Sequence, residues 1–148
     1  MKMQSTDRLA MEKMAAGVIT SLGFLGSDKR PVTDIIEADE EEFRALGLDF
    51  DAVADELVRL ATAGANGLGE PITIGGIWLV KSDEARGKLP CPWGDGIFHK
   101  NSVTVERGGD RIIYSDLSIH LLRVHHFCQG RDSAFRLDPP VIKRILGL

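Results

Sequence analysis

The sequence predicts an α+β fold, with an N-terminal helical layer, a small antiparallel sheet at about residues 71–114 and two C-terminal helices. Apolar side chains recur every three to four residues before Gly64, whereas they alternate after Pro71, so the period changes from helix to strand. Helices and strands that are segregated along the chain are typical of α+β proteins. A length of 148 residues suits a single domain, 1–148, with a weak subdivision near 64–71 where the composition shifts.

Three helices are expected in the N-terminal half. The first begins at Ser5 or Thr6, which can cap it, and runs to about residue 22, where glycines and then Pro31 prevent continuation. A short acidic helix over about 39–46 ends at a glycine, and a third helix spans about 49–63.

Four short strands follow, and they cover residues 72–74, 77–80, 102–107 and 111–114. The last two form a hairpin, because valines alternate along the first of them and the Gly108-Gly109 pair supplies the turn. Gly75-Gly76 is compatible with either a second tight turn or a bulge in one longer strand.

Two helices close the chain. The first covers about 116–128 and is capped by Ser115; the second covers about 139–146, with Asp138 as its cap and Pro139 in its first turn. In the first of them, a helical wheel places one apolar stripe toward the core, made of Leu117, Leu121, Val124 and Cys128. Its helix propensity is weak, so a strand is the alternative for this segment.

The composition favours a soluble cytoplasmic protein. Hydrophobic residues make up 43% and charged residues 27%, and no apolar run approaches the roughly 20 residues that span a bilayer. Charged residues interrupt the first 26 positions, which is unlike a signal peptide. Two cysteines without an export signal indicate free thiols in a reducing compartment, and we expect no membrane association.

The charge is distributed unevenly. Residues 1–75 hold 7 basic and 14 acidic side chains, whereas residues 76–148 hold 11 basic and 8 acidic ones. The acidic segment 34–56 repels phosphate, so nucleic acid is not an expected partner. This segment is interpreted as a solvated helix face; the alternative is a docking surface for a basic protein partner, or for a second copy in a homodimer.

The chemically reactive residues are concentrated in one region. All histidines and both cysteines lie between positions 91 and 128, and they are Cys91, His99, His120, His125, His126 and Cys128. Thiolate and imidazole are the nucleophiles and soft metal ligands that are available near neutral pH. Any reactive centre is therefore expected in this region, and we expect Cys91 and His99 to come within reach of the 116–128 helix and to form the main cleft of the molecule with it.

The first half of the region, residues 88–99, predicts a stiff loop. Pro90 and Pro92 restrict the backbone on both sides of Cys91, and the loop also presents Trp93 and Asp95. Ordered loops on a rigid scaffold often carry function. The alternative is a purely structural loop in which the thiol and the indole are packed.

The second half contains Asp116 and His120, which lie four residues apart on one side of the expected helix. A carboxylate beside an imidazole orients the ring, as in catalytic dyads, so His120 is predicted to be the partnered histidine and His126 to face water. Arg123 competes for the same carboxylate. The alternative is an ordinary surface contact between side chains four residues apart.

Three classes of function fit these residues. A non-catalytic interaction or small-ligand module would use the 88–128 region, with Trp93, Asp95 and Arg123 as binding residues. A zinc-dependent or Cys/His enzyme would use Cys91, Asp116 and His120 as catalytic residues. A structural zinc site would use the set Cys91, His99, His125 and Cys128. The binding module is the leading interpretation, and the zinc content of the protein separates the classes.

Overall fold

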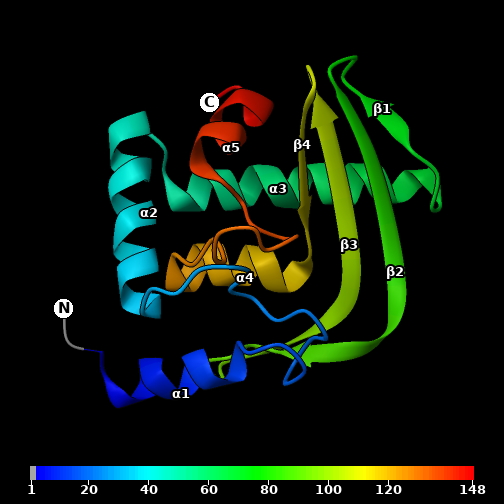
Figure 1. The fold of residues 1–148 in the computed structure, drawn as a ribbon. Coiled ribbons are helices and arrows are strands. Elements are labelled where there is room, and N and C mark those ends of the chain that lie inside the picture. The colour runs from blue at the N-terminus through cyan, green and yellow to red at the C-terminus, as the bar shows by residue number, and fades with distance from the viewer. Residues whose placement is uncertain (1–2) are drawn as a thin grey trace.

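A computed structural model describes residues 3–148 and shows an α+β architecture, as the sequence predicted (Figure 1). The helices are α1 (Ser5–Lys13), α2 (Val32–Leu46), α3 (Phe50–Gly64), α4 (Asp116–His125) and α5 (Pro139–Leu146), with a 3₁₀ turn at Ala65–Gly67. The strands are β1 (Ile72–Ile74), β2 (Trp78–Pro90), β3 (Ile97–Arg107) and β4 (Asp110–Tyr114). They form one sheet in the order β1-β2-β3-β4, and every neighbouring pair is antiparallel.

The β2–β3 hairpin is longer than the sequence indicated. The prediction ended the first strand at residue 80 and began the next at 102, whereas pairing continues to Pro90 and Ile97, with a bulge between Glu84 and Lys88. Residues 81–88 are polar and largely exposed, so they show no apolar alternation. The backbone hydrogen bonds between neighbouring strands form without such an alternation of apolar side chains. The stiff loop is therefore reduced to the few residues that join β2 to β3.

The far half of this hairpin bends under α4 and reaches the level of α1 (Figure 1). The bend carries the β2–β3 connection away from the rest of the sheet and toward the C-terminal end of α4. Gly75-Gly76 proves to be a tight turn, because Ile74 pairs directly with Trp78. The Gly108-Gly109 turn is also present, and both glycines have positive φ.

Two N-terminal helices differ from the prediction. Helix α1 ends at Lys13 instead of near residue 22, and Gly17 then adopts φ +85°, which a helix cannot contain. Helix α2 begins at Val32, seven residues earlier than expected, because Pro31 stands at its N-cap and starts the helix instead of blocking one. Helix α3 agrees with the prediction, and its cap Asp49 accepts a hydrogen bond from the Ala52 N–H at 2.9 Å.

The core has two parts. One lies between the sheet, α3 and α5 and includes Leu57, Val105 and Ile142; the other joins α1, α4 and the 24–35 segment and includes Cys91 and Leu121. The segment 116–128 is a helix only as far as His125. Cys128 lies beyond the end of the helix and is buried, as expected. Val124 lies within the helix, but it is 53% exposed and not in the core.

The acidic side chains of residues 34–56 are exposed or half-buried, except for Asp39. Asp39 is only 4% exposed and forms a two-point ion pair with Arg136, with N–O distances of 2.9 and 3.0 Å. Among residues 3–148, no helix has the length and apolar character needed to cross a bilayer.

Candidate functional site

Four side chains with metal-binding atoms converge where the β2–β3 connection meets α4. Cys91 and Asp95 come from the connection, and His120 and His125 come from the helix. One donor atom from each lies within 4.8 Å of all the others. The sequence analysis expected Cys91 and His99 to come within reach of this helix. Cys91 does, because its Sγ lies 3.6 Å from His125 Nε2, but His99 does not join the cluster. Two cavities that residues 3–148 form beside the β2–β3 hairpin are lined by neither residue, so the expected main cleft is not formed here.

A tight loop fixes the two residues of the connection. The Cys91 N–H donates to the Gly96 carbonyl at 2.9 Å, and the Gly94 N–H donates to the Cys91 carbonyl at 2.8 Å. Gly94 has φ +77°, a conformation that glycine adopts without strain. These bonds fold residues 91–96 back on themselves, so the thiol and the Asp95 carboxylate face the same helix.

Helix α4 fixes the two imidazoles. Ser115 and Ser118 form a reciprocal capping box at its start, and His125 is its last residue, followed by His126 with φ +55°. Residues five apart lie about 140° apart around an ideal helix, yet the two rings reach each other edge to face, with their centroids 5.3 Å apart. Asp95 bridges them, because its Oδ1 lies 2.9 Å from His120 Nε2 and its Oδ2 lies 2.9 Å from His125 Nε2.

Aromatic rings hold both imidazoles in place. Trp93 stacks on His125 with centroids 4.2 Å apart, and Phe98 packs on His120 at 4.6 Å. The Trp93 indole N–H also donates to Asp7 of α1 at 3.0 Å. The ring orientations are therefore set by packing around the cluster as well as by Asp95.

The charges within the cluster are strongly perturbed. Burial, followed by the hydrogen bond with Asp95, raises the pKa of the Cys91 thiol to about 12. Burial alone would raise the pKa of Asp95, but hydrogen bonds from Cys91 and His120 and the nearby imidazole charges hold it well below its usual value. Burial also lowers the pKa of His125, against the opposing effect of Asp95. Asp95 is thus an ionised carboxylate that accepts hydrogen bonds from its neighbours.

The separation of the thiol and one imidazole matches that of neighbouring ligands in a tetrahedral metal site. Zinc bonds of about 2.0–2.3 Å place neighbouring donors about 3.3–3.6 Å apart. The separation of Cys91 Sγ and His125 Nε2, 3.6 Å, has this value. Asp95 contacts the two imidazoles through different oxygens, Oδ1 and Oδ2, each at 2.9 Å, so its carboxylate would have to turn to present one oxygen to an ion held by both rings.

Three other residues named by the sequence analysis lie outside the cluster. His99 is exposed on β3, and Cys128 is buried in the core that contains α3 and α5, so neither joins Cys91. Arg123 binds Asp55 of α3 at 2.8 Å, with Asp51 at 3.5 Å.

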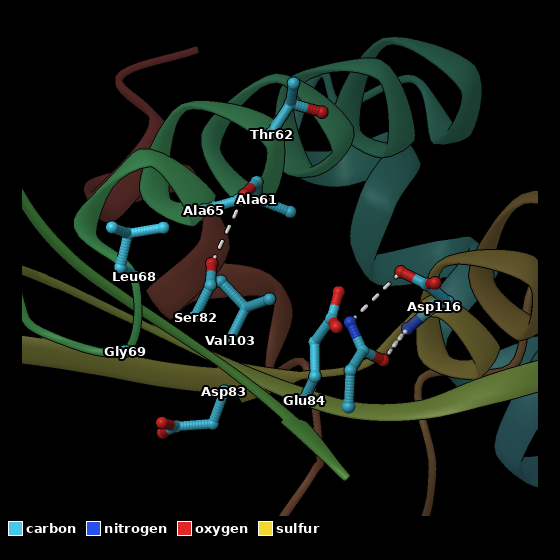
Figure 2. A pocket seen from close by; sticks show the side chains of 11 residues that line it. Ala61, Thr62, Ala65, Leu68, Gly69, Ser82, Asp83, Glu84, Val103 and Asp116 are labelled. Atoms are coloured by element: carbon cyan, nitrogen blue, oxygen red, sulfur yellow. Dashed lines mark hydrogen bonds between the residues drawn. The ribbon is translucent and has the colours of Figure 1, made fainter. Parts of the chain in front are cut away.

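The expected pairing of Asp116 with His120 is wrong. At the first position of α4, the Asp116 carboxylate accepts a hydrogen bond from the Asn101 side chain at 3.2 Å, and its N–H donates back to Asn101 at 2.9 Å (Figure 2). The His120 ring is instead paired with Asp95. His126 does not face water alone either, because it stacks on Phe50 and contacts Glu40 at 2.7 Å.

Sequence reasoning assigned Asp95 to ligand binding and His120 to catalysis, but it did not include either in the metal set. The signal was present as Cys-x3-Asp in a loop and His-x4-His in a helix. Each half alone has no standard metal spacing, so only the bend of the hairpin brings them together. Comparison with protein-family models, with curated proteins and with solved structures gives no match.

Proposed function

We propose that this chain is a zinc-binding protein whose ion is held by Cys91, Asp95, His120 and His125. The observation that carries the proposal is the convergence of four donor atoms within 4.8 Å of one another. Thiolate, imidazole and carboxylate are the groups that bind zinc in proteins, and a thiolate with two imidazoles disfavours the hard ions Mg²⁺ and Ca²⁺. A reducing cytoplasm, which the sequence favours, would keep the thiol available.

The kinds of donor favour a centre with one exchangeable position over a closed structural site. Structural zinc is usually held by cysteines and histidines alone, whereas catalytic zinc has three protein ligands and a fourth position for water or substrate. The Asp95 side chain is 39% exposed, against 14% and 16% for the two histidines, and Cys91 is buried. We therefore assign the exchangeable position to Asp95, and the three enclosed donors hold the ion.

This proposal ranks zinc-dependent chemistry above the binding module that the sequence analysis preferred. A metal at such a centre can polarise a carbonyl or activate water. The roles within the chain are distinct: Cys91 supplies the anionic ligand, the stacked rings fix the two imidazoles, and Asp95 can release its position toward solvent.

Metal analysis of the purified protein tests the proposal. After zinc loading and dialysis, we expect about one zinc per chain, and we expect Cys91→Ala and His120→Ala each to lose it. His99→Ala and His126→Ala are matched controls, because both remove an imidazole from the same region but outside the cluster. A wild-type protein without zinc, or equal loss in His99→Ala, would overturn the proposal.

A further inference from the structure

A cavity of about 550 Å³ lies apart from the four metal-binding side chains. It is formed by the loop 20–26, the loop 129–135 and the middle of the β2–β3 hairpin, and the start of α4 closes it. Its wall is largely apolar, with Phe24, Leu89, Leu117 and Phe135 among the lining residues. A volume of this size and character is typical of small-molecule sites.

One buried polar side chain opens onto this cavity. Gln129 is only 4% exposed, and its Oε1 accepts a hydrogen bond from Ser133 at 2.7 Å. No acceptor for its Nε2 exists among residues 3–148, and this atom is not among those sealed from solvent. Because Gln129 lines the cavity, its free amide N–H groups are available to an oxygen atom of a bound molecule.

The backbone at Gln129 is held in a conformation that is unusual for its residue type. Its φ is +71°, in the left-handed region. Arg136 fixes this conformation by donating to the Gln129 carbonyl at 2.7 Å, and the next N–H, that of Gly130, donates to Phe24 at 2.9 Å. Strained residues that the surrounding structure holds in place are concentrated at binding sites.

The charged residues on the cavity wall indicate which polar group of a ligand the cavity would bind. Lys100 lines the cavity, and no carboxylate within residues 3–148 lies within 4 Å of its ammonium group. Of the acidic residues on the wall, Asp83 forms an ion pair with Lys81 at 3.3 Å, whereas Asp132 accepts a hydrogen bond from the neutral Ser27 hydroxyl and keeps its charge.

The third acid on the wall, Glu84, lines a separate cavity as well. This second cavity, of about 580 Å³, lies between α3 and the hairpin, and Figure 2 shows the Glu84 carboxylate directed into it, toward α3 and Asp116. Within residues 3–148, Lys100 is the one cation among the residues that line the apolar cavity, so it is the group that would pair with an anionic ligand.

We propose that this cavity binds a small apolar carboxylate, with its hydrocarbon body among Phe24, Leu89 and Leu117 and its carboxylate between Lys100 and the Gln129 amide. The inference does not depend on zinc, because none of the four proposed ligands lines the cavity. An ammonium and an amide donor facing an apolar chamber select an anion over a cation or a neutral alcohol of the same length.

Three probes with one hydrocarbon body test the proposal: octanoate, octanol and octylamine. We expect octanoate to bind at one site, with NMR shift changes in residues 22–26 and 129–135, and to bind about tenfold or more tightly than the other two. Lys100→Glu should weaken octanoate binding about tenfold or more. Lys88→Glu is the matched control, because it reverses an exposed charge on the paired strand outside the cavity, and it should leave octanoate binding unchanged.

Ala85→Trp provides a second variant, since Ala85 is exposed at the cavity wall and a large ring there should block all three probes. The proposal is overturned if octylamine binds as tightly as octanoate, or if Lys88→Glu and Lys100→Glu weaken octanoate equally. It is also overturned if octanoate shows no saturable binding at concentrations of about 5 mM.

Discussion

The indole of Trp93 lies flat against the imidazole of His125, with the ring planes 11° apart and the centroids separated by 4.2 Å. This contact fixes the plane of the imidazole, and Asp95 and Cys91 then face its Nε2 atom. A ligand that is oriented before the metal arrives loses little conformational freedom on binding. The stacked pair also places a fluorophore directly beside the proposed metal.

Trp93 should report zinc binding through its fluorescence. Because zinc would bind the imidazole on which the indole stacks, we expect the emission of the metal-free protein to change with added zinc and to saturate at about one equivalent. The Trp78→Phe variant should retain this response, since Trp78 lies on β2 and donates to the Ile145 carbonyl. A titration in which Trp93→Phe responds as strongly as the wild type would contradict the prediction.

Replacing Asp95 should weaken zinc binding without abolishing it. If the three enclosed donors hold the ion and Asp95 occupies the exchangeable position, Asp95→Asn should lose affinity by about 10- to 100-fold and still retain zinc. Competition with a chelator measures this loss, and His120→Ala should bind much more weakly still. Equal loss in the two variants would instead indicate a closed site in which Asp95 is an obligatory ligand.

The sequence was sufficient for the fold class because the change of period at Pro71 is a local signal. It failed for β2 beyond Val80, where polar residues pair through backbone bonds alone and carry no apolar pattern. It also failed at Pro31, where one residue can end a helix or begin one, and only packing decides between the two.

The site was predicted in part for the same reason. Clustering along the chain identified the region, because it can be read from the sequence alone, and it favoured a contact between Cys91 and α4. The partner of His120 could not be found, since a residue one turn away on the same helix looks equivalent to Asp95, which lies 25 positions away. The bend of the β2–β3 hairpin brings Asp95, and not Asp116, to His120, and this bend is a property of the folded sheet.

The buried ion pair between Asp39 and Arg136 should contribute strongly to stability. Asp39→Asn leaves the guanidinium, whose side chain is 15% exposed, with only the longer contact to the more exposed Asp138 at 3.4 Å, so we expect a loss of about 3–5 kcal/mol in the free energy of unfolding. Urea denaturation measures it. Glu41→Gln breaks an exposed ion pair on the same helix and should change stability by less than about 1 kcal/mol. Similar losses of stability in both variants would show that the Asp39–Arg136 ion pair contributes no more than an exposed one.

The contribution of Asp28 to stability should disappear in acid. The buried carboxylate accepts hydrogen bonds from the Arg30 side chain at 2.7 and 2.9 Å, which, with the N–H groups of Arg131 and Arg30, outweigh burial and hold its pKa well below the usual value. A carboxyl group with a lowered folded pKa stabilises the protein above its unfolded pKa of about 3.9, and this stabilisation declines as the pH falls toward the folded value.

The free energies of unfolding of the wild type and of Asp28→Asn should therefore differ by a constant amount between about pH 5.5 and 7, and the difference should shrink below about pH 4. Urea denaturation of both proteins across this range measures it. Glu42→Gln is the control, because its carboxylate is exposed on α2, and its difference from the wild type should stay small throughout. A gap between wild type and Asp28→Asn that persists unchanged at pH 3 would show that Asp28 acts through shape and not through its charge.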